Sequence, residues 1–281
     1  MDYYIRTADG VELRVRIEGV GEPTLLVPLS CWLADDIGGI LKQGSIVSYD
    51  PRGRGGSSAL HDDMDIGLNP DLADLEAVRQ ALGLRRFSLA GWSYYGSLAA
   101  HYASANPHRI TRLVMIAPTP VTRDPYMMEA TERAAERIDW RAVDRLRCWE
   151  KQGIPEESRI EYCRAFYRAY LASAQMAEPL AFDRMKSRPE TWRNEWPASF
   201  GELLFHRLPD ALGAWDWRAV ADKLRVATLV VHGDRDPFPV QGSAGWANSA
   251  DSHLEVLEGT GHYPWLEKPV DFFKVVSEFL V

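Results

Sequence analysis

Polar and apolar side chains alternate near the start of the chain, in residues 3–7 and again in residues 11–17. Between these two stretches lies Asp9-Gly10, a pair that tolerates the left-handed backbone angles of a tight turn. Alternation with a period of two is typical of a strand with one face covered. The pattern therefore predicts that an antiparallel hairpin opens the fold.

After the hairpin, apolar residues occur in short continuous runs instead of alternating with polar ones. Runs of this length are typical of strands that are covered on both faces, as in a parallel sheet. Six further strands are predicted in this way, in residues 24–28, 46–49, 87–91, 113–117, 226–231 and 253–257.

Helical patterns separate several of these strands. One begins at Asn69-Pro70, places Leu72, Leu75, Val78 and Leu82 on one face, and ends at Gly83. An amphipathic tail in residues 269–281 forms another. Alternating strands and helices predict an α/β fold with a mostly parallel eight-stranded sheet. Its ligand site is then expected at the carboxyl ends of the strands.

Residues 123–222 follow a different pattern, in which strand-like runs vanish and helical stretches such as 159–174 are broken by prolines. We interpret this segment as a helical cap, inserted into a core of residues 1–122 and 223–281. Tryptophans in the segment either line an apolar cavity or join the cap helices to one another. Six of the ten lie there, namely Trp140, Trp149, Trp192, Trp196, Trp215 and Trp217.

Composition excludes several classes of protein. A formal net charge of -8 argues against a general surface for nucleic acid or anionic membrane, because such surfaces are basic. The start of the chain lacks a secretory pattern, and no apolar run is long enough to span a membrane, so we expect a cytoplasmic protein. Cys31, Cys148 and Cys163 are widely separated, which fits buried thiols better than a disulfide framework or a zinc site.

A candidate nucleophile follows the run 87–91, in the sequence Gly91-Trp92-Ser93-Tyr94-Tyr95-Gly96. A serine on a sharp strand-to-helix turn is lifted clear of the sheet, and backbone N–H groups there point at one spot. A serine that only caps a helix is the simpler alternative. The downstream sequence favours the nucleophile, since Asp234, Asp236 and His262 follow in the order acid, then histidine.

Four segments together resemble the α/β-hydrolase superfamily, in particular capped serine hydrolases of the esterase, lactonase and proline-iminopeptidase kind. They are residues 49–57, Gly91-Trp92-Ser93, Gly233-Asp234-Arg235-Asp236 and Gly261-His262-Tyr263-Pro264. Each segment alone is weak evidence for this superfamily, whereas four of them in this order are specific to it.

The resemblance implies a catalytic triad. Ser93 would be the nucleophile, and His262 the base that takes its proton. Asp236 would orient the imidazole, because the family places the acid three residues after the glycine of this turn, here Gly233. Asp234 is then expected to bond nearby backbone N–H groups.

Two positions depart from the family pattern. The oxyanion hole would use the N–H of Tyr94 and a second N–H from the loop after the strand 24–28. Relatives usually show His-Gly in that loop, whereas this chain has Pro28-Leu29, which places Ser30 at the second donor. Tyr95 stands where a small residue is usual, and Gly96 is expected to provide the close approach one residue later.

The glycine-rich segment 50–57 could suggest a phosphate-binding loop. It lacks the lysine that directly follows the last glycine of such loops. We therefore expect a structural turn after the strand 46–49. No group of His, Cys and carboxylate residues has metal-ligand spacing, so we expect no metal and no cofactor.

These features predict a serine hydrolase that cleaves a carboxylic ester or lactone with a sizeable apolar portion. Trp32, Trp92 and Trp192 are expected to contact that small-molecule substrate, and no nucleic-acid or membrane partner is expected. Two alternatives remain open. One is an aminopeptidase or amidase like the proline iminopeptidases, and the other is a catalytically weak protein that binds a small molecule. Members of the superfamily that cleave carbon–carbon bonds, or use peroxide or oxygen, also remain open.

Overall fold

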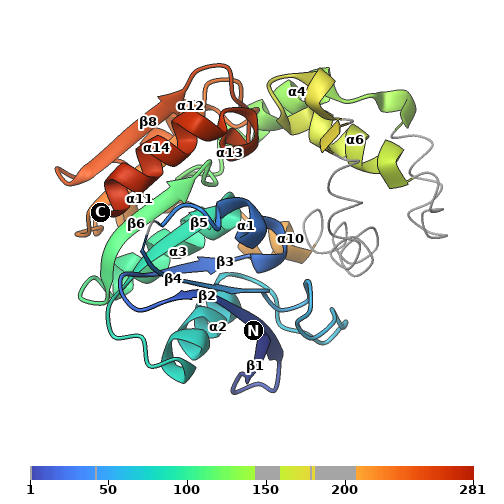
Figure 1. Ribbon diagram of the computed structural model, residues 1–281. Coiled ribbons are helices and arrows are strands. Elements are labelled where there is room, and N and C mark those ends of the chain that lie inside the picture. Colours follow the sequence, from blue (N-terminus) through green and yellow to red (C-terminus); the bar gives the residue numbers. More distant parts are fainter. Residues whose placement is uncertain (1, 42, 143–158, 178, 181–206) are drawn as a thin grey trace.

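The computed structural model describes residues 2–41, 43–142, 159–177, 179–180 and 207–281. A sheet of eight strands forms its centre (Figure 1). The strand order is β1-β2-β4-β3-β5-β6-β7-β8. The strands are β1 Asp2–Arg6, β2 Glu12–Val20, β3 Thr24–Pro28, β4 Gly44–Tyr49, β5 Phe87–Trp92, β6 Ile110–Ile116, β7 Thr228–Gly233 and β8 Ser252–Leu257.

The predicted fold class is confirmed. β1 pairs with β2 and β2 pairs with β4 in antiparallel fashion, while every pair from β4 to β8 is parallel. The hairpin turns where it was predicted, with the N–H of Gly10 donating to Thr7 O at 3.0 Å. The boundaries shift modestly: β6 begins at Ile110 and β7 ends at Gly233.

Both faces of the parallel strands are covered, as the continuous apolar runs predicted. On β3, Leu25 and Val27 face one hydrophobic core, and Leu26 between them faces the other. Helices α1 Ser30–Ile37 and α14 Pro269–Leu280 contribute to the first core. Helices α2 Leu68–Ala81 and most of α3 Tyr94–Ala105 pack in the second. The sheet is therefore the middle layer of three.

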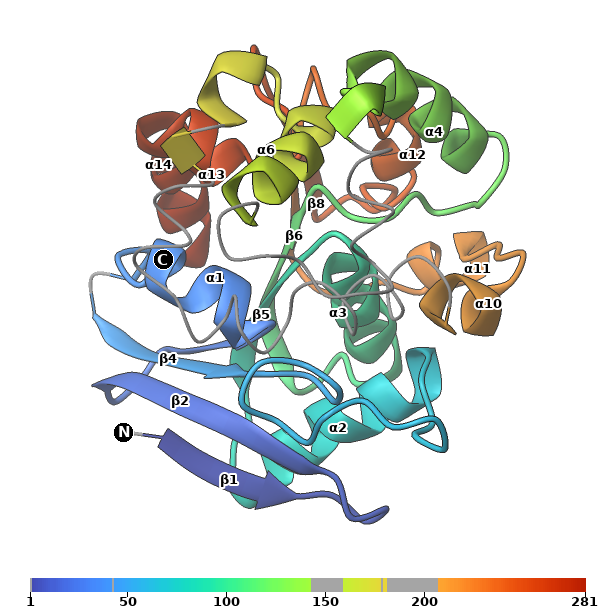
Figure 2. The same ribbon diagram turned by 90° about the vertical axis from the view of Figure 1, so that its right-hand side faces the viewer.

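The segment of residues 123–222 between β6 and β7, which we call the insertion, contains helices and turns but no strand in its described part. It contains α4 Tyr126–Arg137, α6 Arg159–Tyr170, η2 Ala174–Met176, α10 Leu208–Leu212 and α11 Arg218–Ala221. Figures 1 and 2 show α4 and α6 at the end of the molecule where the short helices α12 Val240–Ala244 and α13 Pro264–Glu267 lie.

The insertion leaves the core and returns to it at a single place. Thr122 and Asp216 form an isolated antiparallel bridge. The N–H of Arg123 donates to Trp215 O at 3.0 Å, and the N–H of Trp217 donates to Val121 O at 2.8 Å. These bonds hold the two ends of the insertion side by side.

Among the described residues, no helix is both long and apolar enough to cross a membrane.

Candidate active site

Ser93 lies at the carboxyl end of β5, directly before α3. Its backbone has φ 54° and ψ −127°, a conformation that costs a non-glycine residue about 1–3 kcal/mol. Neighbouring backbone holds it there: the Ser93 N–H donates to Ile116 O at 2.9 Å, and the Ser93 carbonyl accepts from Gly96 N at 2.9 Å and Thr119 N at 3.2 Å. The turn therefore fixes the direction of the serine side chain.

Two glycines permit this turn. A Cβ on Gly91 would overlap the carbonyl oxygen of Tyr95, and one on Gly96 would lie 3.1 Å from the carbonyl oxygen of Gly91. Tyr95 itself is only 4% exposed, and its ring lies 5.3 Å below the Arg54 guanidinium. Gly96 thus lies close to the backbone of Gly91 and to Pro118, while Tyr95 is accommodated as a buried side chain.

His262 lies in the loop after β8 and is held by Asp236 from the loop after β7. The two side chains are 4% and 1% exposed. His262 Nδ1 lies 2.7 Å from Asp236 Oδ2, and Asp236 Oδ1 accepts the N–H of Phe238 at 2.9 Å. Asp234 instead accepts the N–H of Gly259 at 2.5 Å. Of the two aspartates in this turn, Asp236 contacts the histidine and Asp234 fixes the backbone.

Trp92 connects the serine turn to the histidine loop. Its indole N–H donates to the His262 carbonyl oxygen at 2.9 Å, and its ring centre lies 5.2 Å from that of His262. The rings of Tyr263 and Trp265 pack around it at 4.9 Å and 5.3 Å, leaving Trp92 8% exposed. Because β5 and β8 run in the same direction, the candidate nucleophile and the candidate base lie at the same end of the sheet.

A second histidine, His232, lies against the candidate acid, and nothing in the sequence reading singled it out. Its Nε2 is 2.9 Å from Phe238 O and 3.7 Å from Asp236 Oδ2, and its Nδ1 is 2.9 Å from Ser243 Oγ. Burial lowers the pKa of His232, which favours the neutral imidazole. The sequence signal that could have singled out His232 was its position directly before Gly233, at the start of the turn that carries Asp236.

The side chain of Tyr94 pairs with a buried carboxyl group that the sequence analysis missed. Its hydroxyl donates to Asp71 Oδ2 at 2.8 Å. Burial, with a smaller contribution from Asp74, raises the pKa of Asp71 to about 7, although the Tyr94 bond opposes the shift. Asp71 lies four residues before Leu75 and seven before Val78, on the apolar face of α2. That position was the sequence signal for a buried acid.

The two proposed oxyanion donors lie at helix N-termini. Tyr94 is the first residue of α3 and Ser30 the first of α1, where backbone N–H groups have no acceptor within the helix. Leu29, where relatives have glycine, adopts φ 71° and ψ 50°, in the left-handed region. A leucine therefore adopts a backbone conformation here that glycine adopts at lower cost. The Ser30 hydroxyl lies 3.0 Å from Ser48 Oγ.

The tryptophans expected at the substrate are only partly described. Trp192 and the side chain of Trp32 lie outside the described residues. Trp92 packs against the rings of His262, Tyr263 and Trp265. Trp217, from the insertion, is buried below the sheet, where its ring meets those of Trp215 at 5.1 Å and His101 at 5.0 Å. Trp217 therefore joins the insertion to the core.

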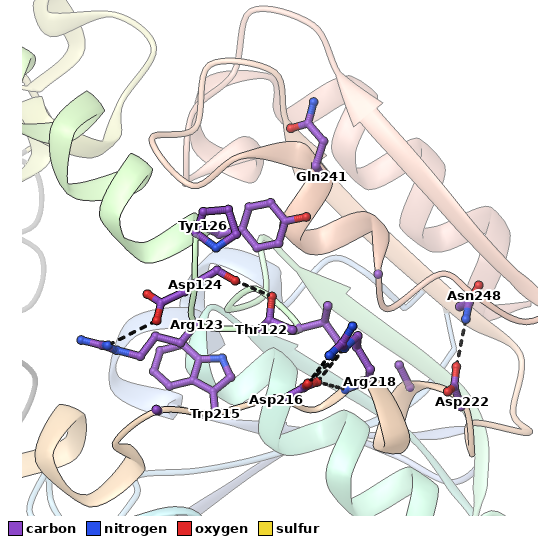
Figure 3. Close-up of a pocket in the computed structure, with 15 residues that line it drawn as sticks. Thr122, Arg123, Asp124, Tyr126, Trp215, Asp216, Arg218, Asp222, Gln241 and Asn248 are labelled. Carbon is purple, nitrogen blue, oxygen red and sulfur yellow. Dashed lines mark hydrogen bonds and ion pairs between the residues drawn. The ribbon is translucent and has the colours of Figure 1, made fainter.

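A surface hollow of about 650 Å³ lies beside the joined ends of the insertion. Figure 3 shows Tyr126 and Trp215 on its walls, with the Arg218–Asp216 ion pair below. Ser93, Asp236 and His262 are not among its lining residues. The hollow and the candidate active site are thus separate places.

The glycine-rich segment 50–57 forms a turn around its own carboxylate. Asp50 Oδ2 accepts the N–H of Gly56 at 2.8 Å, and a Cβ on Gly55 would overlap this carboxylate. Arg52 makes a two-bond pair with Asp74 at 2.8 Å and 2.6 Å. A side-chain anion already occupies the turn, which supports the structural interpretation over phosphate binding.

Comparison with known proteins identifies the family of this chain. A profile of the alpha/beta hydrolase family matches residues 26–275. The chain is 26% identical over 282 residues to 2-hydroxy-6-oxo-2,4-heptadienoate hydrolase of Pseudomonas putida, covering 97% of this chain and 94% of the relative. It is 27% identical over 202 residues to pimeloyl-[acyl-carrier protein] methyl ester esterase of Chromobacterium violaceum, covering 68% and 69%.

A solved structure has the same fold. The esterase EaEST of Exiguobacterium antarcticum superposes with a TM-score of 0.71 at 22% identity, over 100% of this chain and 99% of that one. The profile match spans most of the sequence, from β3 into α14. The chain is therefore a member of the alpha/beta hydrolase family, and it is a hydrolase.

Proposed function

We propose that the protein is a serine hydrolase that cleaves a small carboxylic ester or lactone with a sizeable apolar portion. The observation that carries the proposal is the buried 2.7 Å contact between His262 and Asp236, joined through Trp92 to the strained turn at Ser93. A serine hydroxyl is a weak nucleophile unless a base takes its proton, and this arrangement supplies a base held by an acid.

In the proposed reaction, Ser93 Oγ attacks the carbonyl carbon and passes its proton to His262 Nε2. Asp236 lies 2.7 Å from Nδ1, which leaves Nε2 to take the serine proton and would stabilise the imidazolium that forms. Negative charge develops on the carbonyl oxygen, where the N–H groups of Tyr94 and Ser30 would bind it. His262 then returns the proton to the leaving alkoxide, and the acyl group stays on Ser93.

Water completes the cycle. His262 removes a proton from a water molecule that attacks the acyl-enzyme, and it gives the proton back to Ser93 as the ester bond breaks. A lactone follows the same path, except that its leaving alcohol stays attached to the acyl group. The apolar part of the substrate would lie between the core and the insertion, where Trp32 and Trp92 of the core and Trp192 of the insertion remain proposed contacts.

The names of two similar proteins support an ester substrate. The Chromobacterium violaceum relative and the Exiguobacterium antarcticum structure are both named as esterases. The Pseudomonas putida relative, which matches 97% of this chain, is named as a hydrolase of 2-hydroxy-6-oxo-2,4-heptadienoate. Hydrolysis of a carbon–carbon bond in such a dienoate is therefore the second candidate, since the same three side chains would serve it.

The test is covalent labelling with a fluorophosphonate, a probe that reacts with activated serines, followed by intact-mass measurement. We expect one adduct on the wild type and none on Ser93→Ala. Matched aryl esters, lactones, prolyl amides and a 2-hydroxy-6-oxo-dienoate then rank the substrate classes by kcat/KM. A folded wild type that takes no adduct and turns over none of these substrates contradicts the proposal.

A further inference from the structure

Glu267, the last residue of α13, lies between the histidine loop and the insertion. Its Oε2 accepts the N–H of Gly261 at 2.6 Å, one residue before His262. Its Oε1 accepts the N–H of Ala172 at 2.7 Å, two residues after the end of α6, and Ser173 also donates to it. One carboxylate therefore holds two segments that lie far apart in the sequence.

A direct backbone bond strengthens this junction. The His262 N–H donates to the carbonyl oxygen of Tyr170, the last residue of α6, at 2.8 Å. A Cβ on Gly261 would overlap the same carbonyl oxygen, so only glycine fits between the two segments. The Tyr170 ring also packs against the imidazole of His262, with 5.6 Å between ring centres. The histidine loop is thus seated on the insertion over several adjacent residues.

The chemistry of the junction requires a carboxylate. Each group that contacts the Glu267 side chain at hydrogen-bond distance is a backbone N–H, and a carboxylate has an acceptor oxygen for each segment. A glutamine of the same shape would keep one acceptor and turn its NH₂ group towards the other N–H. Glu267 is half-buried, so a donor left without its acceptor there is costly.

We propose that Glu267 is a positioning residue that couples the insertion to His262, so that the imidazole is aligned with Ser93 only while residues 170–173 are seated on the histidine loop. The inference rests on the proposed function, because it assigns a partner to the proposed base. Glu267 acts through the backbone of Gly261 and His262 and has no contact with the reacting atoms.

The test compares Glu267→Gln with Glu258→Gln. Glu258 lies in the same loop region and is exposed, so the control removes the same charge without touching the junction. The measurements are the fluorophosphonate labelling rate of Ser93, kcat and KM on an aryl ester, and amide hydrogen exchange in peptides that cover 259–263 and 170–174. Exchange reports both sides of the junction and does not depend on turnover.

For Glu267→Gln we expect a fall of about 10- to 100-fold in labelling rate and kcat, since small misplacements of a catalytic group cost this much. KM should stay within about threefold, because the substrate contacts are untouched. Exchange should accelerate in both peptides. Glu258→Gln should match the wild type throughout. A residue that only stabilises the fold would lower the melting temperature and leave kcat per folded molecule unchanged.

A second variant approaches the junction from the insertion. Ala172→Pro deletes the N–H that donates to Glu267 and leaves the histidine loop itself unaltered. It should lower the labelling rate and kcat in the same direction. If either variant folds and labels at the wild-type rate, or if exchange accelerates in only one of the two peptides, the coupling is wrong. If the wild type itself takes no adduct, the proposed function fails instead, and exchange still reports whether the junction exists.

Discussion

The candidate nucleophile and the candidate base are supported in different ways. Ser93 is held by Gly96 of α3, by Ile116 at the end of β6 and by Thr119 shortly after it, all of which lie outside residues 123–222. His262 is held by Asp236 from the β7 loop, by Trp92 from β5 and by Tyr170 from the insertion. The serine turn thus belongs to the core alone, whereas the histidine depends on three segments, one of them the insertion. Disturbing the insertion should therefore affect the base before the nucleophile.

The largest effect is expected from His262→Ala. Turnover of an ester should fall by about four powers of ten, because members of a triad act as one unit. The matched control is His253→Ala, an exposed histidine on β8. Steady-state kinetics on both variants decide the matter, and near-wild-type kcat/KM in His262→Ala would show that the site has been misidentified.

Gly91→Ala should disrupt the turn that holds Ser93. The added Cβ overlaps the Tyr95 carbonyl oxygen within the core, where the backbone has little room to move. We expect the free energy of unfolding to fall by about 3 kcal/mol, the upper range for overpacking. Urea unfolding measures it, with Gly39→Ala as the control, since a Cβ there meets no described atom within 4 Å. Equal stability of the two variants would contradict the tight turn.

Gly261→Ala should disrupt the contact between the histidine loop and the insertion. Its Cβ overlaps the Tyr170 carbonyl oxygen and lies 2.8 Å from Ala172 N, and both belong to the insertion. We expect the insertion to move away from the added methyl group. The variant should therefore lose the alignment of His262 more than it loses stability against unfolding. We expect kcat to fall about a hundredfold, while the urea midpoint changes less than in Gly91→Ala. The same loss of stability in both variants would show that the two supports are not different in kind.

A smaller effect on stability, which depends on pH, is expected from Asp71, the hydrogen-bond partner of Tyr94. Burial raises the pKa of Asp71 to about 7, whereas in the unfolded chain it is near 3.9. The protonated form therefore favours folding, and its contribution is lost as the pH rises towards 7. Because Asp71→Asn carries no charge, its stability relative to the wild type should rise by about 2–3 kcal/mol between pH 5 and pH 8.

Urea unfolding of Asp71→Asn at pH 5 and pH 8 measures this contribution, with the exposed Asp63→Asn as a control for the loss of one charge. A stability difference that does not change with pH would mean that Asp71 is ionised in the folded protein throughout this range.

Sequence patterns predicted the sheet because covered strands and one-faced helices leave periodic signals. The run 24–28 coincides with β3, and Asn69-Pro70 lies in the first turn of α2. The residues proposed for the triad were found because family motifs carry them in contiguous segments. Glu267 and His232 were not found, because their roles depend on contacts with Gly261, Ala172 and Phe238 that no periodicity encodes. The Tyr94–Asp71 pair likewise joins two helices that are separate in sequence.

The bridge between Thr122 and Asp216 makes the insertion an exchangeable module. Its two ends are already side by side, so a loop of a few residues would close the gap while β6 and β7 stay paired. A hydrolase core with such a fold can acquire a different insertion without rebuilding its sheet. Each new insertion would have to bring its own counterpart of Tyr170 and Ala172, since the histidine loop relies on what is seated there.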